Sequence, residues 1–260
     1  MSFSRNIGVL SFEEQEVLRQ TKIAVLGLGG IGGPCFEVLT RTGIGAFHIV
    51  DCDTFEASNK NRQIHAKDST LGQSKIEVAA AAARDINAEV AITKFHTVTE
   101  SNIAEILHGC RVVVHGIDEL KPCIISARYA RRCSIPIVEG WSIPYGNVRV
   151  LTPGTPSLEE SHRLPTLGRP LSDISDEEFR EYGLMVIEQM AHIDGVRDYY
   201  TENVMDQVRQ GLIPSFAPMT WFTSVMMAIE VIKICLGQGS LALGPEFALY
   251  DPFEHRKRFM

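Results

Sequence analysis

The chain has 260 residues, of which 45% are hydrophobic and 22% are charged, a balance typical of globular proteins that argues against a disordered chain. Its net charge of −7, from 25 Lys and Arg against 32 Asp and Glu, gives no support to the basic surface that nucleic-acid-binding proteins usually carry. Between Ser157 and Ser215 there are 12 acids and 5 bases, whereas the rest of the chain is balanced. The acidity therefore belongs to one segment.

Strand and helix patterns alternate over the first half of the chain. Short apolar runs predict buried parallel strands at 22–26, 46–50, 90–95, 112–115 and 135–139. Helices are predicted at 12–20, 34–42, 74–86, 102–107 and 121–132. The first of these helices opens with a capping-box pattern of Ser11 and Glu14. This alternation predicts an α/β fold, a Rossmann-like, doubly wound, mainly parallel sheet with helices on both faces.

The second half of the chain breaks this alternation. We expect a strand at 149–151, helices around 176–190 and 199–210, a long apolar helix at 219–236, and a last strand at 246–250 followed by a basic tail at 255–258. The longest apolar stretch, 225–236, is interrupted by Glu230 and Lys233, so no membrane association is expected. Residues 1–10 lack the apolar region of a secretory signal, so we expect a cytoplasmic protein with free thiols.

A glycine-rich run, Gly27-Leu-Gly-Gly-Ile-Gly32, lies between the first predicted strand and the helix that follows it. The glycines let the backbone turn tightly and approach a phosphate, and the helix N-terminus attracts negative charge. Asp51 follows Gly32 by 19 residues, at the end of the next strand, where a carboxylate can accept hydrogen bonds from a ribose. This pattern predicts a nucleotide site, and on its own it fits NAD as well as ATP.

Three further residues distinguish between these nucleotides. Arg62 stands in the run Ser58-Asn-Lys-Asn-Arg-Gln63, and Lys75 begins the alanine-rich helix. Guanidinium and ammonium groups neutralise the phosphates of a nucleoside triphosphate, and a dinucleotide dehydrogenase does not need them. Asp118, near the end of the fourth strand, can hold Mg²⁺. Each residue alone is typical of a surface or capping position, but their order along the chain favours ATP.

Taken together, these motifs resemble the E1-like adenylating enzymes of the ThiF/MoeB/HesA type. The resemblance rests on the glycine run, Asp51-Cys-Asp53, the run 58–63, Gly72-Gln-Ser-Lys75 and Asp118, and it extends to Arg5. It covers residues 4–154 well and 216–252 more loosely. Within the family, the stretches 41–45 and 61–65 are most similar to the branch that cyclises threonylcarbamoyladenosine on tRNA.

The resemblance implies a reaction in which a substrate carboxylate attacks the α-phosphate of ATP, giving an acyl-adenylate and pyrophosphate. It implies that ATP is bound by Gly27, Gly29, Gly30, Gly32, Asp51, Asp53, Asn59, Arg62, Gln63 and Lys75. Among these, the resemblance assigns the ribose to Asp51 and the triphosphate to Asn59, Arg62 and Lys75. The catalytic residues it implies are Arg62, Lys75, Arg5 and Asp118, the last as the Mg²⁺ ligand. Because Arg5 would reach into the partner subunit's site, a homodimer is implied.

The same resemblance implies one adenylation domain over residues 1–260. Its parts are a nucleotide-binding core at 1–154, a helical insertion at 155–218, and a C-terminal helix, strand and basic tail at 219–260. The chain departs from the family pattern in two ways. It has no C-x-x-C pair, so no zinc is expected. Some members of the family take the acyl group as a thioester on a cysteine in the crossover region after the fifth strand. Residues 134–234 of this chain contain no cysteine, so no thioester is expected at that position.

The insertion is interpreted as the segment that meets the substrate, and the alternative is that it only covers the sheet or builds the dimer. Its acidity predicts a substrate that is neutral or basic around its carboxylate, with Glu177, Glu178 and Glu181 as the charges to test. The same acidity would repel a tRNA backbone. His162 and His192 also fall in the insertion, where a histidine is more often an ordinary surface or core residue.

The expected substrate is therefore the carboxylate of a peptide, a carrier protein or a small molecule, and nucleic acid is not expected. Three other functions remain open at this point. They are a tRNA threonylcarbamoyladenosine dehydratase, a nucleotide-binding dimeric partner without catalysis, and an NAD-dependent oxidoreductase.

Overall fold

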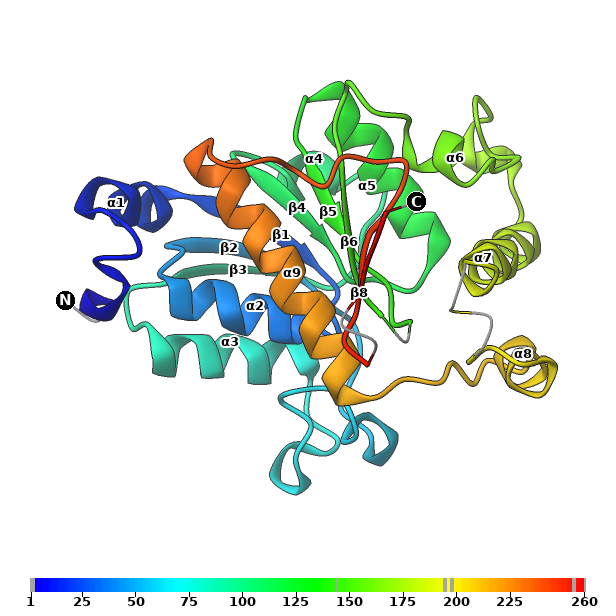
Figure 1. Ribbon diagram of the computed structural model, residues 1–260, viewed down its shortest axis with the longest axis horizontal. Coiled ribbons are helices and arrows are strands. Elements are labelled where there is room, and N and C mark those ends of the chain that lie inside the picture. The colour runs from blue at the N-terminus through cyan, green and yellow to red at the C-terminus, as the bar shows by residue number, and fades with distance from the viewer. Residues whose placement is uncertain (1–2, 144, 194–195, 197–198, 254–255, 260) are drawn as a thin grey trace.

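The protein is built on a sheet whose first five strands are parallel. A computed structural model describes residues 3–143, 145–193, 196, 199–253 and 256–259. Its eight strands have the order β3-β2-β1-β4-β5-β6-β7-β8 (Figure 1). The parallel strands are β1 Lys22–Leu26, β2 Ala46–Val50, β3 Ala91–Phe95, β4 Val112–His115 and β5 Ile137–Glu139. The antiparallel strands are β6 Gly146–Leu151, β7 Ala248–Asp251 and β8 Arg256–Phe259.

Helices cover both faces of the sheet because its central strands are apolar on both sides. Along β1, Ile23 and Val25 belong to one core, and Ala24 and Leu26 belong to the other. The first core is covered by α1 Phe12–Gln20, α2 Gly32–Thr42, α3 Lys75–Ile86 and α9 Ala217–Leu236 (Figure 1). The second is covered by α4 Ile103–Ile106, α5 Leu120–Arg132, α6 Leu158–Ser161 and α7 Asp176–Ala191. The predicted doubly wound architecture is confirmed.

Local capping explains where several helices begin and end. Ser11 Oγ accepts from the backbone N–H of Glu14 at 3.1 Å, and Glu14 Oε2 accepts from the N–H of Ser11 at 2.7 Å, so the predicted capping box is confirmed. α2 and α9 end at Gly43 and Gly237, which adopt positive φ angles of 92° and 67° that disfavour other residues. Short 3₁₀ helices occur at Ser4–Asn6, Ala57–Asn59, Asp68–Thr70 and Leu171–Asp173.

The differences from the predicted elements lie mainly in the second half of the chain. The expected strand at 149–151 begins earlier, at Gly146, and the expected helix at 199–210 is the shorter α8, Glu202–Arg209. Part of the expected basic tail at 255–258 lies in β8, Arg256–Phe259, which pairs with β7, while position 255 lies outside the described residues. Strand pairing uses backbone groups only, and charged side chains are common on an edge strand because they discourage further pairing.

The long apolar helix α9 is a core element in this fold. Among the helices of the described residues, only α9 is long and apolar enough to cross a membrane by length and composition, and half of its 18-residue window is buried inside the protein. It packs against α2 and β6, and its buried Glu230 pairs with Lys233. A soluble protein's central helix has the same properties, so this helix alone is weak grounds for a membrane span.

Candidate active site

A cavity of about 400 Å³ lies at the carboxyl ends of the parallel strands. The strand order reverses between β1 and β4, because the chain runs outward to β2 and β3 on one side and to β5 on the other. Ligands of doubly wound sheets bind at such a switch point. The lining residues come from the glycine loop, the loop after β2, the start of α5 and the insertion. The predicted nucleotide motifs and the insertion therefore meet at one site.

The four glycines of the loop have two different structural tasks. A Cβ on Gly27, which has a φ of +88°, would lie 2.3 Å from Gly116 O, and a Cβ on Gly32 would lie 1.9 Å from Gly27 O. These two positions need glycine because backbone segments touch there. A Cβ on Gly29 or Gly30 would meet only the side chains of Gln63 or Arg62, at 3.7 and 3.2 Å. Gly29 and Gly30 thus keep the cavity side of the loop open beside Gln63 and Arg62.

The carboxylate of Asp51 ties the end of β2 to the glycine loop. Its Oδ2 accepts from the backbone N–H of Leu28 at 2.7 Å, and its Oδ1 accepts from that of Asp53 at 2.9 Å. Asp53 in turn accepts from Lys75 Nζ at 2.8 Å, and Lys75 is buried. All three residues line the cavity, as the sequence predicted. Lys75 is therefore held at the cavity wall by its contact with Asp53.

Arg62 and Gln63 reach the cavity from the loop between β2 and α3. Arg62 Nη1 donates to Ser58 O and Asn61 Oδ1, at 3.1 and 2.9 Å. Buried Gln63 has an Oε1 atom with no hydrogen-bond partner among the described residues. Two contacts fix the loop from outside, since the Trp221 indole N–H donates to Arg62 O and the Asn61 amide donates to Ser215 O, both at 2.7 Å.

Three predicted residues lie away from the described lining of the cavity. Gly32 packs behind the loop, as its close approach to Gly27 shows. Asn59 is buried in the β2–α3 loop, where its Oδ1 accepts from the N–H of Glu56 at 3.1 Å. Arg5 is exposed next to Asn6, whose amide donates to Thr42 O at the opposite end of α2 from the glycine loop. Arg5 thus cannot reach the cavity of its own subunit in this arrangement.

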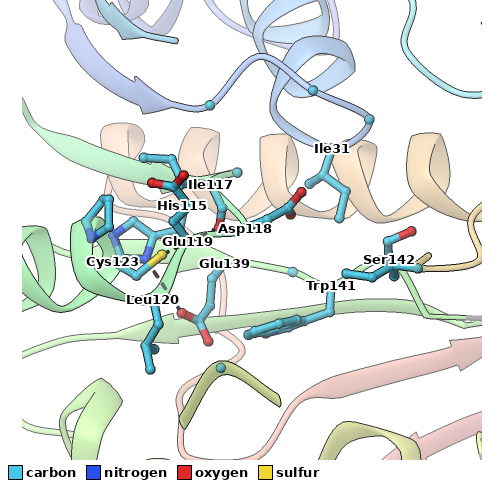
Figure 2. A pocket seen from close by; sticks show the side chains of 18 of the residues that line it. Ile31, His115, Ile117, Asp118, Glu119, Leu120, Cys123, Glu139, Trp141 and Ser142 are labelled. Carbon is cyan, nitrogen blue, oxygen red and sulfur yellow. Dashed lines mark hydrogen bonds and ion pairs between the residues drawn. The ribbon is translucent and has the colours of Figure 1, made fainter. Parts of the chain in front are cut away.

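Asp118 faces the cavity from the connection between β4 and α5 (Figure 2). Its side chain is solvent-accessible through the cavity although protein atoms surround it, and this crowding raises the pKa of its carboxyl while Arg62 and Lys75 oppose the rise. No group of three or more His, Cys, Asp and Glu residues in the described parts of the chain is arranged to hold a metal by itself. Mg²⁺ commonly takes one or two carboxylates together with substrate phosphates, and Asp118 fits that mode.

A buried polar network that the sequence did not reveal lies at the other end of the cavity. Arg149 Nε donates to Glu139 Oε1 at 2.6 Å, and Arg149 Nη2 donates to His162 Nε2 at 2.7 Å. Burial would raise the pKa of Glu139, but the Arg149 charge, with His115 and His162, lowers it to about 2. Burial and the same arginine lower the pKa of His162 to about 4. His162, expected to be an ordinary residue, is thus a neutral, buried wall of the cavity.

The insertion contributes a mainly apolar wall. Its lining residues in α6, α7 and the segments that follow include Leu158, Gly183, Val186, Ile187, Met190, Ala191, Tyr200 and Ile213. Glu177, Glu178 and Glu181 are not among the described lining residues, and Glu178 pairs with Arg169 at 3.0 Å. Exposed His192 is also outside the described lining. The acidic face of α7 therefore points away from the cavity, and its charge does not contact a ligand held there.

Cys52 and Cys123 are the cysteines that line the cavity. All six cysteines of the chain are described and free, as expected. Burial raises the pKa of the Cys123 thiol, as it does for Cys52, where Asp53 and Asp51 add to the effect. The thiolate is the nucleophilic form, so neither thiol is activated.

Comparison with known proteins agrees with this arrangement. The chain is 38% identical over 125 residues to the tRNA threonylcarbamoyladenosine dehydratase of Escherichia coli K12, an alignment that covers 47% of each protein, so the chain spans less than half of that relative. It is 26% identical over 242 residues to the molybdopterin-synthase adenylyltransferase of Haemophilus influenzae, covering 90% of this chain and 83% of the relative.

Among solved structures, the E. coli tRNA N6-threonylcarbamoyladenosine dehydratase in complex with AMP has a similar fold, with a TM-score of 0.65 and 22% identity over 91% of this chain and 94% of that one. The ThiF family matches residues 3–260, nearly the whole chain. With the glycine loop, Asp51, Arg62, Lys75 and Asp118 gathered at the switch point, the protein belongs to the ThiF family.

Proposed function

We propose that this protein is an ATP-dependent adenylyltransferase that activates a carboxylate as an acyl-adenylate and releases pyrophosphate. The observation that carries the proposal is the convergence of the glycine loop, Arg62 and Lys75 on one cavity whose opposite wall is apolar. The cationic end suits a triphosphate, and the apolar wall contributed by the insertion suits the body of an organic acid. The resemblance to an adenylyltransferase over most of both chains supports the same activity.

In the proposed reaction the residues of the chain position and neutralise rather than react. The helix N-terminus behind the glycine loop and the cations Arg62 and Lys75 hold the phosphates, which exposes the α-phosphorus to the carboxylate. Asp51 offers its remaining acceptor capacity to a ribose hydroxyl. Asp118 would hold Mg²⁺, which supplies charge neutralisation to the departing pyrophosphate.

The insertion and Arg5 bear on the substrate and on the assembly. The apolar wall from the insertion favours a peptide, carrier-protein or small-molecule carboxylate with an apolar body. The position of Arg5, outside its own cavity, is compatible with a role in the site of a second subunit, and we propose a homodimer for that reason. Six free thiols suit the reducing cytoplasm, where we expect the protein to act.

A tRNA threonylcarbamoyladenosine dehydratase is the second candidate. It is favoured by the 38% identity to the E. coli enzyme, which is confined to 125 residues. The acidic outer face of α7 disfavours it, since a tRNA backbone would be repelled. Salt-sensitive binding of tRNA would support this candidate over the first.

Pyrophosphate exchange tests the proposal. Radiolabelled pyrophosphate should enter ATP only when a suitable carboxylate is present, and a library of peptides and small acids can be screened for it. Arg62→Ala and Lys75→Ala should abolish the exchange, whereas Lys60→Ala, a solvent-exposed lysine paired with Asp68, should not. Exchange that is unchanged in Arg62→Ala and Lys75→Ala would contradict the assignment of the phosphate site.

A further inference from the structure

Two hydrogen-bond acceptors face each other where β4 and β5 end at the cavity. His115 ends β4 and Glu139 ends β5, and the two residues are register partners in these neighbouring parallel strands. Both are buried and both line the cavity (Figure 2). His115 Nδ1 lies 3.8 Å from Glu139 Oε2, which is too long for a hydrogen bond.

The hydrogen bonds around His115 determine which of its nitrogens carries the proton. Ser126 has a single hydroxyl hydrogen, and its Oγ lies 2.9 and 3.0 Å from the carbonyl oxygens of Pro122 and Cys123 within α5. With that hydrogen used on the helix, Ser126 Oγ accepts from His115 Nε2 at 2.8 Å. Nδ1 is then a bare acceptor, and it has no hydrogen-bond partner among the described residues.

The charge of this end of the cavity is already balanced. Glu139 is neutralised by Arg149, and His162 accepts a hydrogen bond from the same guanidinium. A cation added here would be a buried charge without a counter-ion, which is unfavourable. An uncharged donor is not penalised in this way, and it would satisfy both acceptors.

We propose that His115 Nδ1 and Glu139 Oε2 form a subsite for an uncharged primary amine, the nucleophile that consumes the acyl-adenylate. The inference rests on the proposed adenylation and names its second substrate. A nitrogen about 2.9 Å from both acceptors would direct one N–H to each. Its lone pair would remain free. The apolar side chains of Val186 and Met190 nearby suit an amine on an apolar body.

The step that follows is balanced by groups present in the site. The amine nitrogen attacks the acyl carbon of the mixed anhydride, a C–N bond forms, and the bond from that carbon to the phosphate oxygen breaks. AMP leaves with the electron pair of the broken bond. The nitrogen loses one proton to His115 Nδ1, which passes it to the phosphate of the departing AMP, so no cation stays in the site and the product is an amide.

The test measures donor recognition directly. The probe is O-benzylhydroxylamine, which is uncharged near neutral pH and has two N–H hydrogens on an apolar body, and the matched ligand is benzyl methyl ether, which has none. Calorimetry should show that the wild-type protein binds the probe about tenfold more tightly than the ether. His115→Phe should remove this preference. His48→Phe, the same change at a buried histidine whose Nδ1 donates to Ile106 O outside the described lining of the cavity, should keep it.

A second measurement needs no variant. In ¹⁵N-labelled wild-type protein, the Nδ1 resonance of His115 should shift when the probe is added and stay unchanged with the ether. Equal binding of probe and ether, or a preference that survives in His115→Phe, would overturn the inference. Mg-ATP binding is measured on the same samples. If ATP binds and the probe shows no preference, the subsite fails alone, and if ATP does not bind, the proposed adenylation fails.

Discussion

Lys75 Nζ lies 2.8 Å from Asp53 Oδ2, and the two members of this pair differ sharply in exposure, since the lysine side chain is 8% exposed and that of the aspartate 63%. The buried ammonium is therefore held at the cavity wall by a carboxylate that water could solvate if the proposed triphosphate replaced it. Lys75 is thus preorganised at the cavity wall, and the exposed Asp53 can leave this ion pair at little cost because water solvates its carboxylate.

Lys75→Met should weaken ATP binding by at least about tenfold, because it removes a charge-assisted contact to phosphate. Asp53→Asn should have a smaller effect, since Lys75 keeps its charge. Calorimetric titration with Mg-ATP checks both, with Lys60→Met as a surface control. An unchanged dissociation constant for Lys75→Met would show that this lysine does not meet the nucleotide.

Two glycine substitutions in the same loop should separate stability from binding. Gly27→Ala brings a Cβ within 2.3 Å of Gly116 O at a positive φ, so it should lower the free energy of unfolding by about 3 kcal/mol. Gly30→Ala meets only the flexible Arg62 side chain, so stability should change by less than about 1 kcal/mol. ATP affinity should nevertheless fall. Urea unfolding and nucleotide titration measure the two effects, and the reverse pattern would contradict the division of tasks among the glycines.

The free energy of unfolding should fall as the pH drops below 6.5, the ordinary pKa of histidine. Burial and Arg149 lower the pKa of His162 from 6.5 to about 4, so between these values the unfolded chain binds a proton that the native protein does not. The resulting loss is on the order of 3 kcal/mol from pH 6.5 to 4. The pKa of Glu139 is lowered from 4.5 to about 2, so its protonation causes a second loss of stability between these two pH values.

Urea midpoints measured at a series of pH values test this dependence. His162→Gln should flatten the slope between pH 6.5 and 4, while His192→Gln, at an exposed histidine, should leave it unchanged. Some slope of the same sign should persist, because burial also lowers the pKa of His48 and His65. A profile identical in His162→Gln and wild type would show that His162 titrates normally.

Asp118→Asn should raise the Mg²⁺ concentration that gives half-maximal pyrophosphate exchange, by about tenfold, because it removes the carboxylate offered to the metal. The fold should be retained, since Asp118 faces the cavity. Asp176→Asn, at an exposed partner of Lys121, is the matched control. A Mg²⁺ dependence that does not move would exclude Asp118 as the ligand.

No covalent thioester should accumulate on the protein during turnover. The thiols of Cys52 and Cys123 have raised pKa values, so each is protonated at neutral pH and is a poor nucleophile. Mass spectrometry of the protein after incubation with ATP and an accepted acid should show no thiol-labile adduct. Cys52→Ala and Cys123→Ala should keep pyrophosphate exchange, and a trapped adduct at any cysteine would disprove the expectation.

The grouping of residues at the proposed nucleotide end of the site was predictable from the sequence, because these residues lie in short local patterns. Gly29 and Gly30 stand in a recognisable strand–loop–helix, and Asp51 and Asp118 follow apolar strands, so parallel topology brings them to one edge. The other end was not predictable. Glu139, Arg149 and His162 are joined by packing between β5, β6 and the segment after α6, and no local pattern records which polar side chains become buried together.

Charge composition was the least reliable guide to the site. The excess acids of the insertion lie outside the described lining, because an amphipathic helix turns its apolar residues inward and its charges outward. The expectation that Glu177 and Glu181 meet the substrate is not supported by the geometry. The polar residues that do face the cavity, His115 and Glu139, could have been noticed only as polar ends of otherwise apolar strands.

The contacts around Ser215 connect two parts of the cavity. Ser215 O accepts a hydrogen bond at 2.7 Å from the amide of Asn61, the neighbour of Arg62. Ser215 Oγ accepts a second hydrogen bond, also at 2.7 Å, from Ser142 Oγ beside the apolar wall. If a carboxylate substrate binds there and shifts Ser142, it would also shift the support of Arg62, to which we propose that the phosphates bind. The affinities for the two substrates are then linked, and each must change the other by the same factor. Such reciprocity would appear as a dissociation constant for each substrate that changes when the other substrate is present.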